Sequence, residues 1–136
     1  MMPRTEMIPH WQAQQLTAFS VADDFQVSPF YSDGKTYGTP TWIWSVVVAG
    51  HLFVRAWHGV NSRWHRSAVK QRAGRMHLAG ANYEISFVDV ANADLNRKID
   101  RAYQKKYADS PYLASMIQKR PRESTLEIVP RSERKS

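Results

Sequence analysis

Apolar and polar residues alternate along much of the chain with the two-residue period of β-strands. With the turn residues between them, these runs predict six strands, at residues 25–31, 42–48, 51–57, 75–79, 83–88 and 125–129. Ala49-Gly50 separates the second run from the third, and Gly80-Ala81-Asn82 separates the fourth from the fifth. Each of these two pairs is therefore expected to form a β-hairpin. The first hairpin is apolar on both faces, so we expect one face in the core and the other against a partner or ligand.

A period of three to four residues marks the remaining segments as helices. Residues 10–19 predict a short helix anchored by Trp11, and residues 63–71 a second one that Ser62 can cap. Asn92 can cap a helix that runs to Tyr107, directly after the fifth strand. Its apolar stripe has helical spacing and consists of Leu95, Ile99, Ala102 and Tyr103. Residues 112–119 predict a last short helix.

These elements predict a mainly β fold with short helices: a six-stranded antiparallel split β-barrel with a helix after the fifth strand. The length suits a single domain at residues 10–130, with a flexible lead-in at residues 1–9 and a polar tail at residues 131–136. The chain has no Cys, and no apolar run approaches a membrane span or a signal peptide. We therefore expect a cytoplasmic protein without a membrane partner.

Charge is distributed unevenly along the chain. Of 19 basic and 12 acidic residues, which leave a net charge of +7, six basic residues and no acidic one fall between Tyr37 and Gly80. The six are Arg55, Arg63, Arg66, Lys70, Arg72 and Arg75. A field of one sign indicates an anionic partner, although a solvated basic face is the alternative.

The same stretch offers candidate groups for a phosphate and for a flat ring. A phosphate needs guanidinium, hydroxyl and backbone N–H donors at close range, and Arg55, Ser62, Arg63 and Arg66 surround a predicted helix start. Trp57 and Trp64 border the same loop and are better candidates for ring walls than Trp42 and Trp44, which suit the core.

The histidines and late-helix polar residues carry weaker signals. Four of the five histidines lie in this stretch without a metal-binding spacing, so no metal site is expected. Tyr103 is expected to be a packing residue, and Lys106 and Tyr107 are minor candidates for the ligand site.

Several short runs between Trp11 and Pro130 carry a family resemblance. They are Asp33-Gly34, Tyr37-Gly38, Thr39–Trp44, Leu52–Arg55, Arg63–Arg66, Gly74-Arg75, Ala102-Tyr103, Lys106-Tyr107, Thr125-Leu126 and Pro130. On these residues the chain resembles the flavin-binding split-barrel superfamily, typified by pyridoxamine 5′-phosphate oxidase and the deazaflavin-dependent nitroreductases. More closely, it resembles an uncharacterised bacterial branch of that superfamily, a domain of unknown function.

The resemblance implies a homodimer that binds a phosphorylated flavin-type cofactor. The backbone of Thr41 and Trp42 would lie beside the ring and Trp57 would shield it, while Arg55, Ser62 and Arg63 would hold the phosphate, with Trp64 and Arg66 nearby. The deazaflavin-dependent enzymes carry Pro-x-Trp-Tyr-x-Asn-Leu here, and residues 62–68 keep only its Trp. Flavin mononucleotide (FMN) and a deazaflavin coenzyme therefore both stay open, and no catalytic side chain is identified.

Three functions compete at this point. The first is a flavin- or deazaflavin-binding oxidoreductase with a small-molecule substrate. The second is a split barrel that has lost its cofactor and acts as a non-redox enzyme or as an interaction subunit. The third is a module for single-stranded nucleic acid, which basic and aromatic residues also suit. It is the least favoured of the three, because the basic residues form one compact block and no RNA-binding signature is present.

Overall fold

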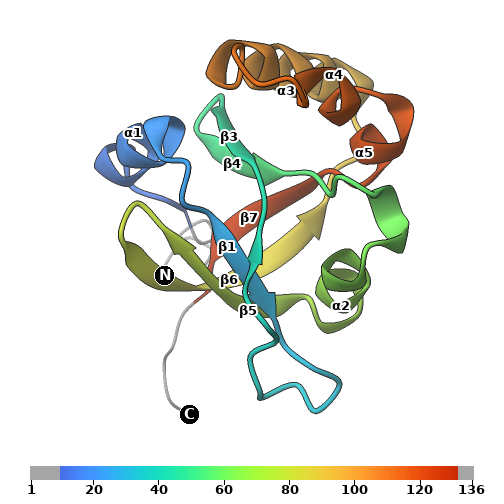
Figure 1. Cartoon of the computed structure of the whole chain (residues 1–136). Coiled ribbons are helices and arrows are strands. Elements are labelled where there is room, and N and C mark those ends of the chain that lie inside the picture. Colours follow the sequence, from blue (N-terminus) through green and yellow to red (C-terminus); the bar gives the residue numbers. More distant parts are fainter. Residues whose placement is uncertain (1–9, 132–136) are drawn as a thin grey trace, which may run out of the picture.

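The computed structural model describes residues 10–131. These residues form a single antiparallel sheet of seven strands that curls into a half-barrel, with five α-helices around it (Figure 1). The strands are β1 (Gln26–Pro29), β2 (Thr41–Trp42), β3 (Ser45–Val48), β4 (His51–Val54), β5 (Ala73–Leu78), β6 (Ala81–Asp89) and β7 (Leu126–Pro130), in the sheet order β2-β1-β5-β6-β7-β4-β3. The helices are α1 (Ala13–Val21), α2 (Arg63–Gln71), α3 (Ala93–Lys106), α4 (Leu113–Met116) and α5 (Lys119–Glu123), and a short 3₁₀ helix, η2 (Gly59–Asn61), precedes α2.

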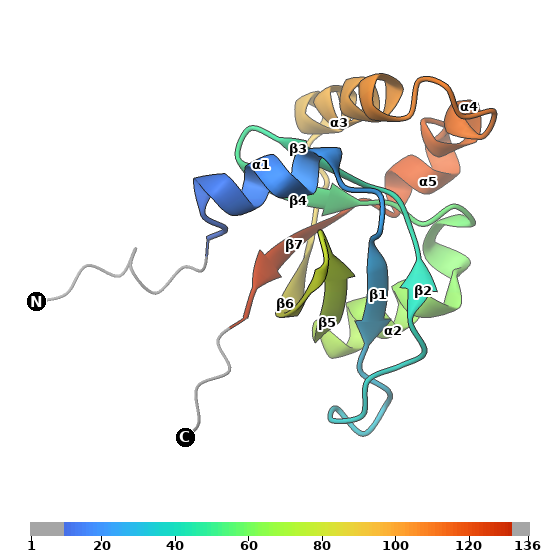
Figure 2. The same cartoon turned by 60° about the vertical axis from the view of Figure 1, so that its left-hand side comes forward.

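The predicted mainly β, antiparallel fold is confirmed, but the predicted number of six strands is wrong. The expected strand at residues 42–48 is divided at Ile43 and Trp44 into β2, which pairs with β1, and β3, which pairs with β4. These strands form the two opposite edges of the sheet. Residues 43 and 44, here called the crossing segment, therefore carry the chain from one edge to the other (Figure 2). Alternation of apolar residues continues through such a change of partner, so it does not reveal the break.

Both predicted hairpins are confirmed, but the second turn lies at Ala79-Gly80 and not at Gly80-Ala81-Asn82, because Ala81 and Asn82 already pair in β6. Their two-residue turns are Ala49-Gly50 and Ala79-Gly80, with positive φ at all four residues (52°, 83°, 53° and 78°). Positive φ at both turn residues gives the twist that a tight hairpin needs, and alanine adopts it at a cost.

The helices follow the prediction closely, with two corrections. Helix α2 has its predicted bounds, and the Asn92 side chain caps α3 by accepting a hydrogen bond from Leu95 N at 2.8 Å. The predicted helix at residues 112–119 is instead the short α4, and a further helix, α5, follows it. Pro121 lies in the first turn of α5, where its missing N–H costs nothing, so the proline does not mark the end of helical structure here.

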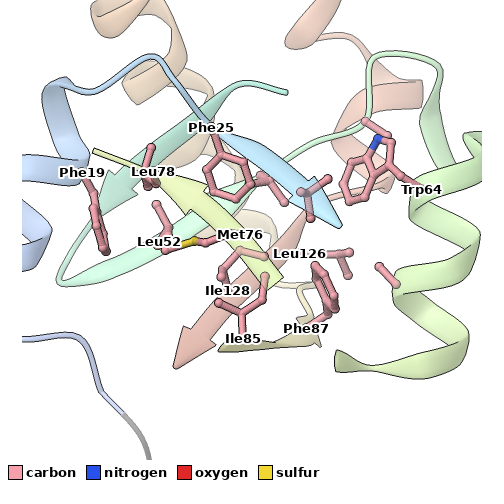
Figure 3. Packing of buried hydrophobic residues seen from close by; sticks show 14 of the residues in the cluster. Phe19, Phe25, Leu52, Trp64, Met76, Leu78, Ile85, Phe87, Leu126 and Ile128 are labelled. Atoms are coloured by element: carbon pink, nitrogen blue, oxygen red, sulfur yellow. The ribbon is translucent and has the colours of Figure 1, made fainter. Parts of the chain in front are cut away.

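The apolar core fills the inside of the curled sheet. Figure 3 shows Phe25, Leu52, Met76, Ile85 and neighbouring side chains converging there, with Phe19 of α1 and Trp64 of α2 at its two sides. Trp11 is the predicted anchor of the N-terminal segment, because it is buried and its indole N–H donates to Ile128 O at 2.8 Å.

The outer face of the first hairpin is covered by the chain's own helix. Val46 and Phe53 pack there against Ile99 and Tyr103 of α3, and Met116 of α4 completes this second cluster. The expected partner or ligand on that face is therefore replaced by α3.

The predicted ends of the chain lie mostly outside the described residues. The lead-in at residues 1–9 and residues 132–136 of the tail belong to this part. Arg131 does not belong to a free tail, since its guanidinium donates to Ile85 O at 3.2 Å and pairs with Glu84. None of the helices within residues 10–131 combines the length and the apolar character needed to cross a membrane.

Candidate functional site

A cavity of about 610 Å³ lies beside the crossing segment. Three parts of the chain surround it: β2 with the crossing segment, the region from β4 to the first turn of α2, and the start of α4. The lining residues are Thr41, Trp42, Ile43, Trp44, Arg55, Trp57, His58, Ser62, Arg63, Trp64, Tyr112 and Met116. The volume falls in the range of small-molecule sites.

Seven of the eight predicted site residues lie around this one cavity. They are Thr41, Trp42, Arg55, Trp57, Ser62, Arg63 and Trp64. The eighth, Arg66, is exposed on α2 and is not part of the lining. The sequence does not predict a role at this site for Ile43, His58, Tyr112 or Met116. Tyr112 and Met116 join it because the chain after α3 folds back over the loop that follows β4.

Arg55 is fully buried and all five of its N–H donors are used within the protein. Its Nε donates to Thr125 Oγ1 at 2.9 Å. Nη1 donates to Asp100 Oδ1 and to Met116 O, and Nη2 to Asn96 O and Oδ1 at 3.2 and 3.0 Å. A guanidinium has five donors, so none remains for a phosphate. Arg55 instead joins β4 to α3, α4 and the residues before β7.

The first turn of α2, in contrast to Arg55, has hydrogen-bond donors that the protein itself does not use. Ser62 is the N-cap residue, yet its hydroxyl makes no capping hydrogen bond. The backbone N–H groups of the first turn have no acceptor within the helix, and no acidic residue lies in this turn. Arg63 is exposed, and no carboxylate within residues 10–131 forms an ion pair with it. This end of the cavity therefore presents unused donors and a positive charge.

Aromatic rings form the walls and mouth of the cavity. Trp42, Trp57 and Tyr112 are 66%, 39% and 59% exposed, and the rings of Trp57 and Tyr112 meet edge to face at 5.3 Å. The rings of Trp57 and Trp44 also meet edge to face, with their centroids 6.5 Å apart. The expectation that Trp42 is a core residue is wrong, because β2 is an edge strand and the Trp42 side chain lies outside the core. Trp64 is instead a core residue whose ring also lines the cavity.

Two side chains of α3 and the Tyr107 side chain, directly after the helix, hold the wall that contains Trp44. The Tyr107 ring stacks on Trp44 at 4.0 Å with an interplanar angle of 3°. Tyr103 is buried, as expected for a packing residue, and its hydroxyl donates to Trp44 O at 2.9 Å. Lys106 Nζ donates to Ser45 O at 2.9 Å. Burial raises the pKa of Tyr107 to about 12 and lowers the pKa of Lys106 to about 8.

The histidines do not form a group. His58 lines the cavity, whereas His65 is buried behind it with Nε2 donating to Ser124 O at 3.0 Å. Burial lowers the pKa of His65. His51 pairs with Glu127 and His77 with Asn82, both away from the cavity. Within the described part of the chain, no three His, Cys, Asp or Glu side chains are placed to hold a metal ion.

Comparisons with known proteins reach the level of a family. No curated protein and no solved structure matches the chain, so the resemblance to flavin-binding split barrels remains a resemblance. A family model matches residues 15–128, which cover the sheet except the last two residues of β7 and all five helices except the first two residues of α1. The chain therefore belongs to the bacterial family described as "Uncharacterized protein conserved in bacteria (DUF2255)".

Proposed function

We propose that the cavity binds a flat aromatic cofactor with a phosphate group, of the FMN or deazaflavin type, and that the protein is an oxidoreductase-like member of its family. The observation that carries this proposal is the division of the cavity into two chemically different parts. One part is walled by indole and phenol rings, and the other is the first turn of α2 with Ser62 and Arg63. A phosphorylated aromatic cofactor has the same division.

The ring part suits a planar conjugated molecule. Trp57 and Tyr112 expose apolar faces at the mouth, where a ring can stack and exclude water. Because β2 is an edge strand, backbone groups on its outer side have no sheet partner and are available to polar atoms on the rim of a ring. Thr41 and Trp42 supply this backbone, as the family resemblance implies.

The phosphate part differs from the expected set of residues. Arg55 has no free donor, so we assign the phosphate to Arg63, to the Ser62 hydroxyl and to the open N–H groups of the first turn of α2. Arg66 lies outside the lining and has no role in this assignment.

The chemistry of such a site would come from the ring, which accepts and donates hydride equivalents when it is bound. The protein would bind the phosphate, orient the ring against the crossing segment and exclude water with Trp57 and Tyr112. No Asp or Glu among residues 10–131 lines the cavity, which favours neutral or anionic substrates over cationic ones.

Titration of the purified protein with FMN, riboflavin and a deazaflavin coenzyme tests this proposal. We expect micromolar FMN binding with quenching of tryptophan fluorescence, and binding of riboflavin, which lacks the phosphate, weaker by at least about tenfold. No binding of either phosphorylated cofactor at micromolar concentrations would contradict the proposal.

The exposed rings at the mouth also favour single-stranded nucleic acid as a second candidate, because bases stack on aromatic side chains. A gel-mobility assay with generic oligonucleotides at two salt concentrations separates the two. Strong, salt-sensitive oligonucleotide binding without FMN binding would replace the cofactor proposal by this one.

A further inference from the structure

The crossing segment is a weakly supported part of the cavity wall. Ile43 and Trp44 line the cavity, but they belong to neither β2 nor β3. Ile43 N donates to Phe25 O at 3.2 Å and the Ile43 side chain packs against the main core. Trp44 is contacted by Tyr103 of α3 and by Tyr107, the residue directly after α3. The position of the wall therefore depends on α3 as well as on the sheet.

Lys106, the last residue of α3, connects three elements behind this wall. Its Nζ donates to Ser45 O at 2.9 Å and to Phe19 O at 3.3 Å, and it lies 5.4 Å from the centre of the Tyr107 ring. One ammonium group thus joins α3, the start of β3 and the end of α1 directly behind Trp44. The Tyr107 ring, whose hydroxyl also bonds Ser45 O, then carries the stack on Trp44.

A lysine in this position is not explained by an ion pair. No carboxylate within residues 10–131 lies within ion-pair distance of Nζ. Burial lowers the pKa of Lys106, and the carboxylates that oppose this lowering from a longer distance are those of Asp23 and Asp24, in the segment after α1. Asp24 is itself committed to the backbone N–H groups of Ala79 and Gly80. Burial of an amine costs free energy. In this position the two hydrogen bonds to backbone carbonyl oxygens offset that cost.

We infer that Lys106 is a positioning residue of the cavity, which fixes Trp44 as its wall by tying the Trp44–Ser45 backbone to α1 and α3. The ligand part of this inference rests on the proposed function. The structural part, the placement of the Trp44 ring, can be tested without any ligand.

The test uses protein labelled with fluorotryptophan, in which each of the five tryptophans gives one ¹⁹F signal. A Trp44→Phe variant assigns the Trp44 signal. In Lys106→Met we expect this signal to shift or broaden while the signals of the core residues Trp11 and Trp64 stay in place, and FMN affinity to fall about tenfold. Lys106→Arg, which keeps a charged donor, should restore the Trp44 signal and bring the affinity within about threefold of the original.

The neighbouring Lys105 provides the matched control. It is exposed and lies outside the cavity lining, and its side chain makes no hydrogen bond or ion pair within the described residues, so Lys105→Met should change neither readout. If Lys106→Met does not fold, Lys106→Gln, which keeps one donor group, should shift the Trp44 signal in the same direction by less.

The outcomes separate the two proposals. An unchanged Trp44 signal and unchanged affinity in Lys106→Met, or equal effects in Lys105→Met, would overturn the role of Lys106. If the original protein binds no FMN, the proposed function fails, and the Trp44 signal alone still decides whether Lys106 positions the wall.

Discussion

Arg55 and Arg63 line the same cavity and have opposite surroundings. The Arg55 guanidinium is buried with every donor paired, whereas Arg63 is exposed beside an uncapped helix start. Burial of an arginine requires that its charge and donors be satisfied, so Arg55 is committed to holding the fold. A basic residue with unused donors is the one that can hold an anion. A count of charges treats the two arginines alike. Only the groups around each one show that Arg55 supports the fold and that Arg63 is available to bind an anion.

Replacing Arg55 should have the largest effect. Arg55→Met removes the link between β4, α3 and the Thr125 region and leaves Asp100 with Arg122 alone, so we expect the free energy of unfolding to fall by about 3–5 kcal/mol. Urea denaturation measures this change, and Arg63→Gln should stay within about 0.5 kcal/mol of the original protein. A stable Arg55→Met variant that loses FMN binding would reverse the roles assigned to the two arginines.

Trp64 and Trp57, which border the same loop, should differ in the same way, the first affecting stability and the second affecting binding. Trp64 is 8% exposed and packs in the core, so Trp64→Leu should lower the free energy of unfolding by about 2–3 kcal/mol. Trp57 is 39% exposed at the cavity mouth, so Trp57→Leu should leave stability nearly unchanged and weaken FMN binding about fivefold. Thermal unfolding and FMN titration of both variants check this, and equal losses of stability would contradict the separation.

At Ser62, stability and binding should change in opposite directions. Ser62→Asp places a strong N-cap residue and a negative charge at a helix start that now lacks a side-chain cap, so stability should rise by about 0.5 kcal/mol. The same carboxylate repels a phosphate, so FMN affinity should fall at least about tenfold while riboflavin affinity changes little. Equal losses for FMN and riboflavin would place the phosphate elsewhere.

The smallest expected effect is a pH dependence of stability that comes from His65, a buried residue in the first turn of α2. Burial lowers the pKa of His65 below its ordinary value of 6.5. Above pH 6.5 the imidazole is neutral in both states, and on acidification the unfolded chain takes up the proton first, so the free energy of unfolding should fall as pH drops below 6.5. Urea denaturation at pH 7.0 and 5.5 measures this fall. It should be smaller in His65→Gln, which keeps a donor for Ser124 O, and an equal fall in both proteins would exclude His65 as its source.

Periodicity and turn residues predicted most of the fold. The bounds of α2, both hairpins, the Asn92 cap and the Trp11 anchor follow from local patterns, and these agree with the structure. The division between β2 and β3 does not follow, because it depends on which distant strand each half pairs with. The packing of α3 on the outer face of the first hairpin is equally non-local. The sequence pattern does not show this contact, and for that reason it predicts a partner or ligand on that face.

Seven of the eight residues predicted from the acid-free stretch line one cavity, but the sequence does not show which groups each of them contacts. The partners of Arg55 come from Asn96, Asp100, Met116 and Thr125, which are far away in the chain, so its commitment to the fold has no local signature. The contribution of Tyr112 likewise depends on the return of the chain after α3.

The most direct measurement is the ratio of riboflavin to FMN dissociation constants in three proteins: the original chain, Arg63→Gln and Arg66→Gln. The two arginines are exposed on the same helix, and only Arg63 lines the cavity. Riboflavin and FMN carry the same ring, so the contribution of ring binding cancels in the ratio. The ratio therefore reports the phosphate contact alone. We predict a ratio of at least about ten in the original chain and in Arg66→Gln, and a ratio at least about threefold lower in Arg63→Gln, in which the Ser62 hydroxyl and the helix N–H groups remain. Equal ratios in the two variants would contradict the assignment of the phosphate to the first turn of α2.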